Sequence, residues 1–222
     1  MLLALATVAL AADVTKDVAK DTLDIGVLKN SEVRVVQKML YRKEGTMEIG
    51  ATLGVMPFDG YTITPQLTLS GVKHLSENVG LELQLGGGYG LENAVYTELA
   101  GPTYQVAVEA YRYLASAEAD VQYTLAYAKM NLGGKKVLHH DVYVLGGLGV
   151  TLESSLLPAG DLAIAPTLPI GIGARLYASK TSFIKLELRD SMLVEYRAQS
   201  QTWGFKQNVG INVGLSVLTG GK

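Results

Sequence analysis

IKLELRDSMLVEY, the sequence of residues 184–196, begins with a regular alternation of apolar and charged side chains. Ile184, Leu186 and Leu188 point to one side of an extended chain, and the charged residues between them point to the other side. This period of two predicts a β-strand with one apolar face and one charged face. The apolar face must lie against a core or lipid, whereas the charged face needs water or charged partners.

Composition limits the classes of protein to which the chain can belong. It has 222 residues and a formal net charge of −2, which gives a nucleic-acid partner no electrostatic support. Hydrophobic residues make up 48% of the chain, yet no run of about 18 apolar residues is present that would cross a bilayer as a helix. Cysteine is absent, which excludes disulfides, thiol catalysis and cysteine-bound metals.

The first residues predict export. Residues 2–10 are almost continuously apolar, and Ala9-Leu10-Ala11 has the small-x-small pattern that precedes a signal-peptidase cut. We interpret residues 1–11 as a signal peptide, with a buried N-terminal strand or helix as the alternative. Residues 12–45 are charged and mixed, and we expect them to form a short periplasmic segment, in which residues 31–41 fit either a helix or a strand.

The alternation of the opening stretch recurs along the rest of the chain. Turn signals rich in Gly, Pro, Asn and Asp separate the alternating runs. Eight strands are expected, at residues 46–55, 61–69, 79–91, 120–130, 141–152, 167–178, 184–196 and 207–218. The longest break is residues 92–117, in which the alanine-rich part 104–117 fits either a helix or a strand.

Eight strands suggest a closed barrel. An even number lets an antiparallel sheet close on itself, and closure removes the strand edges that hydrocarbon cannot satisfy. The expected connections are alternately short and longer, as in bacterial outer-membrane barrels with short periplasmic turns. We therefore predict an all-β protein in which residues 46–218 form an eight-stranded antiparallel transmembrane β-barrel, located in the outer membrane of a Gram-negative bacterium and surrounded by its lipid.

A soluble, lipocalin-like barrel would show the same alternation with the two faces exchanged. The polar face is rich in glycine, which relieves crowding inside a narrow barrel, and its few charges are of both signs and can pair in a lumen. We therefore assign the apolar face to lipid. This face also carries Tyr61, Tyr89, Tyr123 and Tyr127, which are either an interfacial girdle or ordinary strand tyrosines. Asp190 falls on it too, which a nearby bulge or a position at the membrane boundary would explain.

The polar face supplies the candidate site. We predict a lumen network of five charged residues, Glu48, Glu82, Lys185, Glu187 and Arg189. Such a row is either an ion path or a structural network. An eight-stranded barrel leaves an interior that side chains fill, which favours the structural interpretation.

Evidence for catalysis is weak. His139-His140-Asp141 is the cluster that could suggest a metal or catalytic site, but adjacent strand residues point to opposite faces, so the two histidines cannot share one metal. Serines occur in the expected loops, at 154, 155 and 200, without a motif that supplies a base. We expect no enzymatic activity, no cofactor and no metal.

Three stretches resemble the outer-membrane β-barrel domain proteins of myxobacteria and their deltaproteobacterial relatives. These are VRVVQKMLYRKEGTMEIGATLGV at 33–55, GGKKVLHHDVYVLGGLGV at 133–150 and IKLELRDSM at 184–192. The resemblance implies export, outer-membrane insertion and a non-enzymatic role, and some members look like parts of larger envelope assemblies. We therefore expect a structural or docking role in an envelope complex, through residues 92–117 or the N-terminal segment. A narrow, porin-like channel and a small-ligand-binding barrel are the alternatives.

Overall fold

The structure is a computed structural model that describes residues 42–132, 136–157, 160–197 and 200–220. The expected signal peptide, and the expected periplasmic segment up to residue 41, lie outside these residues. In the described part, no helix is long and apolar enough to span a membrane.

The described chain is almost entirely β-strand. The elements in order are β1 (Met47–Met56), β2 (Thr62–His74), β3 (Val79–Gly88), β4 (Leu91–Glu92), α2 (Ala94–Ala100), β5 (Tyr111–Leu132), β6 (Lys136–Ser155), β7 (Leu162–Tyr177), β8 (Ser182–Arg197) and β9 (Thr202–Thr219). Each of the long strands has the alternating pattern that the sequence predicts for a sheet with two chemically different faces.

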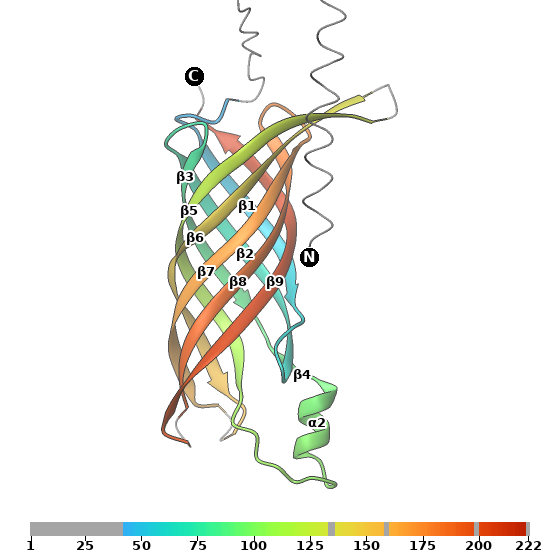
Figure 1. Cartoon of the computed structure of the whole chain (residues 1–222), viewed down its shortest axis with the longest axis vertical. Coiled ribbons are helices and arrows are strands. Elements are labelled where there is room, and N and C mark those ends of the chain that lie inside the picture. The colour runs from blue at the N-terminus through green and yellow to red at the C-terminus, as the bar shows by residue number, and fades with distance from the viewer. Residues whose placement is uncertain (1–41, 133–135, 158–159, 198–199, 221–222) are drawn as a thin grey trace, which may run out of the picture. The chain divides into compact units, whose positions relative to one another are not determined.

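Eight strands close into an antiparallel barrel, as predicted (Figure 1). The ring runs β1-β2-β3-β5-β6-β7-β8-β9, and β1 pairs with β9 to close it, from Met47 opposite Thr219 to Val55 opposite Ile211. Strand β4 lies outside the ring and pairs only with the start of β2. Closure satisfies the backbone groups that would otherwise form an open edge.

The two ends of the barrel differ. We call the end at Met47 and Thr219 the proximal rim and the end at Met56 and Thr202 the distal rim. Turns after β2, β5 and β7 lie at the proximal rim, and those after β1, β3, β6 and β8 lie at the distal rim. At the proximal rim, β5 and β6 continue as a two-stranded hairpin beyond their neighbours, because β3 stops pairing with β5 at Tyr123 and β7 stops pairing with β6 at His139 (Figure 1).

The long connection between β3 and β5 contains the helix of the described part. Asn93 caps α2 by accepting a hydrogen bond from the Tyr96 backbone N–H. Tyr96 packs with Val108, Ala110 and Leu156 in a small apolar cluster at the distal rim. The helical alternative for residues 104–117 is wrong: β5 begins at Tyr111, and the helix lies further upstream at Ala94–Ala100.

Several strands are also longer than expected, such as β5, which spans Tyr111–Leu132 instead of residues 120–130. The predicted loops before β7 and before β9 are shorter than expected, because β6 extends to Ser155, β7 begins at Leu162 and β9 begins at Thr202. Proline at 166 and glycine at 204 suggest loops in the sequence, but both lie in strands at the distal rim. Tertiary pairing with long neighbouring strands overrides these local signals.

Candidate functional site

The interior of the barrel is polar and the exterior is apolar. Glu48, Glu82 and Arg175 are fully or almost fully buried, whereas Leu83 and Leu148 are about 70% and 71% exposed. The same division holds along the eight strands, where buried positions alternate with exposed Leu, Ile and Val. A soluble barrel with an apolar core would show the reverse arrangement, so the lipocalin-like alternative is wrong.

Arg189 is at the centre of the buried charges. Its guanidinium lies 3.0 Å from Glu82 Oε2, 2.8 Å from Asp120 Oδ2 and 2.9 Å from Glu187 Oε1. It also pairs with Glu118. All of these side chains are at most 4% exposed, so the network is shielded from water and each member depends on its partners.

Lys185 links this group to the next. Its ammonium lies 2.8 Å from Glu82 Oε1, 3.5 Å from Glu187 Oε2 and 4.0 Å from Glu48 Oε1. The structure therefore brings together all five residues of the predicted lumen network. Because they come from β1, β3 and β8, the contacts cross the lumen as well as following one strand.

A third cation, Arg175, extends the network toward the proximal rim. Arg175 is fully buried and lies 3.3 Å from Glu48 and 3.2 Å from Asp141. The ammonium of Lys43 lies 2.6 Å from the other oxygen of Asp141 and donates a hydrogen bond to Thr124. The pKa of Lys43 is lowered, mainly by burial and then by the nearby positive charge of Arg175. The ion pair with Asp141 acts in the opposite direction and partly offsets this decrease.

Tyr143 fills the remaining space beside these ions. It is fully buried, donates a hydrogen bond to Glu187 at 2.7 Å, and has the Arg175 guanidinium 4.1 Å from its ring centroid. A side chain at position 173 would overlap the tyrosine ring, so Gly173 makes room for it. Large side chains thus occupy the lumen, as expected for eight strands.

Sequence reasoning missed several partners in this network. Six further residues belong to the network besides the five predicted ones: Lys43, Glu118, Asp120, Asp141, Tyr143 and Arg175. Asp120, Asp141, Tyr143 and Arg175 fall within the expected strands, where their inward parity was available, whereas Lys43 and Glu118 lie outside those strands. The missing information was the register between strands that are far apart in the sequence.

The three histidines occupy separate environments. His74 ends β2 and contacts Glu48 Oε2 at 3.1 Å. His139 contacts the Tyr127 hydroxyl at 2.6 Å, and Asp141 is held by Lys43, Arg175 and Tyr177. Among the described residues, no group of three or more His, Asp or Glu side chains is arranged to hold a metal ion.

The four tyrosines of the predicted girdle do not share one environment. Tyr89 and Tyr123 are half-exposed on the outer face. Tyr127 instead turns inward and contacts His139 and Tyr177, because a register shift between Thr124 and Ala126 reverses the alternation. Tyr61 packs edge-on against Tyr96 in the distal cluster.

Asp190 remains on the outer face. Its strand pairs without interruption on both sides, opposite Ile170 and Val209, so the bulge proposed from the sequence is wrong. The carboxyl is half-buried, and its Oδ1 has no hydrogen-bond partner in the described part of the chain. Burial raises the free energy of such a group, so Asp190 is a weak point in the apolar surface.

Comparison with known proteins supports the fold. No family model and no curated protein matches the chain. Among solved structures, the N-terminal β-barrel domain of Pseudomonas aeruginosa OprF matches with a TM-score of 0.51 and 15% identity, over 79% of this chain and 98% of that chain. Ail, the attachment invasion locus protein of Yersinia pestis, matches with a TM-score of 0.42 and 15% identity, over 79% and 99% of the two chains. Neisserial surface protein A matches with a TM-score of 0.44 and 8% identity, over 78% and 95%.

The OprF match shows a shared fold, and the lower scores of the other two add no argument. Membership of the myxobacterial family stays a prediction. The barrel is closed, with an apolar exterior and a charged interior, and such a surface requires lipid around it whatever the chain resembles. The chain is therefore an eight-stranded β-barrel of the Gram-negative outer membrane.

Proposed function

We propose that the protein is a non-enzymatic structural or docking barrel of the cell envelope, and that its lumen is sealed. The observation that carries this proposal is the filled interior, in which Arg175, Lys185 and Tyr143 are at most 1% exposed. Ion pairs join Arg175 to Glu48 of β1 and Lys185 to Glu82 of β3, and the Tyr143 hydroxyl donates a hydrogen bond to Glu187 of β8. A solute path would require several of these buried pairs to break together, which costs several kcal/mol for each.

The distal rim supports the docking part of the proposal. The connection between β3 and β5 is held by its own apolar cluster and also exposes apolar side chains, with Val95 52%, Tyr104 56% and Val106 46% exposed. These lie beyond the strands, where lipid is not needed to cover them. Exposed apolar side chains on an ordered segment are typical of a surface that contacts another protein.

Ion conductance tests the sealed lumen. We expect the purified protein in planar bilayers to give no stepwise conductance under conditions in which a porin control conducts. Discrete steps that change with Arg189→Ala would contradict the proposal and support the narrow channel instead, because Arg189 occupies the lumen.

Site-specific crosslinking tests the docking role separately. A photo-crosslinking residue at Tyr104 should give a defined protein adduct in native membranes, and Val95→Asp should remove the adduct by disrupting the exposed apolar surface. The same crosslinker at Lys180, in the β7–β8 turn at the opposite rim, is the matched control. A Tyr104 adduct that is insensitive to Val95→Asp, or no adduct, would count against docking at this connection.

A further inference from the structure

The barrel wall is split at the distal rim. Pairing between β7 and β8 stops at Thr167 opposite Leu193. Beyond this point β7 continues to Leu162 along β6, and β8 continues to Arg197 along β9. Pro166, next to the last pair, has no backbone N–H to donate, which suits a local strand edge. The two strands therefore diverge instead of sealing the wall.

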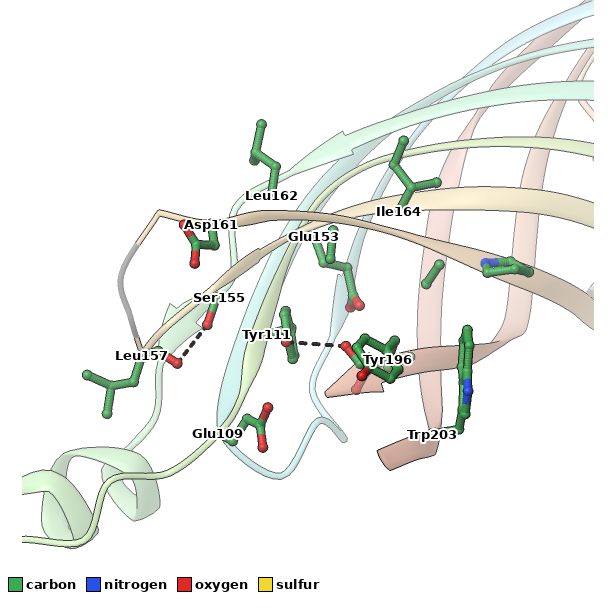
Figure 2. A pocket seen from close by; sticks show the side chains of 14 residues that line it. Glu109, Tyr111, Glu153, Ser155, Leu157, Asp161, Leu162, Ile164, Tyr196 and Trp203 are labelled. Atoms are coloured by element: carbon green, nitrogen blue, oxygen red, sulfur yellow. Dashed lines mark hydrogen bonds between the residues drawn. The ribbon is translucent and has the colours of Figure 1, made fainter. Parts of the chain in front are cut away.

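A cavity of about 590 Å³ lies at this split (Figure 2). The volume is within the range of small-molecule sites. Its apolar lining includes Leu162 and Ile164 of β7 together with Tyr196 and Trp203. Carboxylates line it as well: Glu109, Glu153, Asp161 and Glu195. An apolar wall thus faces a cluster of negative charge.

The two deepest carboxylates share one cation. Glu153 is 0% exposed and Glu195 is 6% exposed. Glu153 Oε1 lies 3.0 Å from the Lys206 ammonium, whereas its Oε2 is buried and accepts no hydrogen bond from an ammonium or N–H group of the described chain. Glu195 Oε1 lies 3.5 Å from the same ammonium, and the Glu195 and Glu153 side chains also interact with each other directly, so the pair can share one proton. Figure 2 shows the Glu153 carboxylate directed toward Tyr196.

Lys206 cannot neutralise this site. It also pairs with Asp59 at 3.0 Å, so one ammonium is shared among three carboxylates. Of the described residues that line the cavity, none is cationic. Uncompensated charge at a buried site is costly, and a bound cation would remove that cost.

The lining favours an organic cation over a metal. Among the described residues, the carboxylates of the lining and their neighbours do not form a group of three or more that could hold a metal ion. Tyr196 and Trp203 instead form an aromatic pair with ring centroids 5.2 Å apart. Aromatic faces attract ammonium and guanidinium groups and also cover apolar bodies.

We propose that this cavity binds an amphipathic organic cation, with a primary ammonium group near Glu153 and Glu195 and an apolar body against Tyr196, Trp203 and Ile164. The opening between β7 and β8 gives such a molecule access from the side of the barrel. The proposal needs the barrel fold but not the docking role, so either can fail without the other.

Trp203 provides a direct measurement, because it is the single tryptophan of the chain. Phenethylamine is titrated into the full chain in non-ionic detergent, with 2-phenylethanol and phenylacetate as neutral and anionic controls of similar shape. We expect a saturable change in tryptophan fluorescence with the amine and not with the controls. No saturable signal, or equal binding of the alcohol, would overturn the proposal.

Variants locate the site. Glu153→Gln and Glu195→Gln should each weaken amine binding about tenfold, because each removes a charged acceptor. Glu98→Gln removes an exposed carboxylate of α2 at the same rim and should leave binding unchanged. A difference in gel migration between boiled and unboiled samples checks that each variant is folded. Unchanged affinity in a folded Glu153→Gln or Glu195→Gln variant would contradict the assignment.

The ammonium group could belong to a lipid headgroup or to a soluble amine. Short-chain phosphatidylethanolamine is therefore added as a competitor, with phosphatidylglycerol as its control. Competition by phosphatidylethanolamine alone assigns the site to a lipid headgroup, and lack of competition assigns it to a soluble amine. Equal competition by phosphatidylglycerol would contradict recognition of the ammonium group.

Discussion

Arg189 has more carboxylate partners than Lys43, Arg175 or Lys185, the other cations of the network, because Glu82, Glu118, Asp120 and Glu187 all contact it. Arg189→Ala leaves these acids buried without their shared cation. We expect a loss of about 3–5 kcal/mol in the free energy of unfolding, the usual cost of removing one partner from a buried pair. The midpoint of urea unfolding in detergent or lipid vesicles measures this change.

Arg42→Ala is the matched control for Arg189→Ala. Arg42 pairs with Glu44 at 2.9 Å, but its side chain is 74% exposed, so water replaces the interaction when it is removed. The unfolding midpoint should barely move. Equal shifts for the two variants would contradict the view that burial, and not the number of charges, makes the interior network important.

The side on which the five predicted network residues lie was predictable from parity. Lys185, Glu187 and Arg189 alternate with leucine in one strand, which fixes their common face without any knowledge of the fold. The identity of their partners was not predictable, because Glu82 and Asp120 meet Arg189 only through the registers of intervening strands. Parity also placed Asp190 correctly. The alternation of its strand predicts an outward carboxyl, and the pairing of β8 with its neighbours contains no bulge that would turn the carboxyl inward.

Strands β5 and β6 are longer than the neighbours that flank them, and the two parts of their hairpin face different surroundings. Leu148 lies within the ring and is 71% exposed on the outer face, whereas Met130 lies in the extension beyond the proximal rim and is 46% exposed. The sequence could not separate these parts. Both are apolar residues of an alternating strand, and only the end of pairing with β3 and β7 shows where the ring stops.

Glutamate substitutions distinguish the two parts of the hairpin. Leu148→Glu places a carboxylate against hydrocarbon and should lower the free energy of unfolding by roughly 1–3 kcal/mol. Met130→Glu should have little effect because its side chain projects beyond the ring. Unfolding of both variants in lipid vesicles checks this prediction, and a similar loss for Met130→Glu would place the extension in lipid.

A bulge in β5 explains why the predicted outward orientation of Tyr127 is wrong. Sequence alternation places Tyr127 on the same face as Tyr123, but the shift between Thr124 and Ala126 turns Tyr127 toward His139. A bulge adds one residue to one strand of a pair, so it is invisible in either strand alone. The strand at 120–130 was therefore predicted correctly, while the orientation of its second half was not.

The closed barrel as a whole was predictable because the constraint is general: eight alternating strands with an apolar face need closure in lipid. The differences between the two rims of the barrel could not be predicted from the sequence. The projecting hairpin at the proximal rim and the split between β7 and β8 at the distal rim both arise where a strand outlasts its partner. Pairing lengths depend on neighbours far apart in the sequence, which a reading of single strands cannot give.

Orientation in the membrane follows from the same asymmetry. Outer-membrane barrels have short periplasmic turns and longer external connections, which predicts that the distal rim, with the connection between β3 and β5, faces the outside. The chain has no cysteine, so a single introduced thiol is the only labelling site. In intact cells, a membrane-impermeant maleimide should label Thr103→Cys, an exposed residue of that connection. Lys180→Cys, exposed in the β7–β8 turn, should react only after the outer membrane is permeabilised. The reverse pattern would show that the barrel is inserted with its proximal rim outward, and it would place the proposed amine site on the periplasmic side.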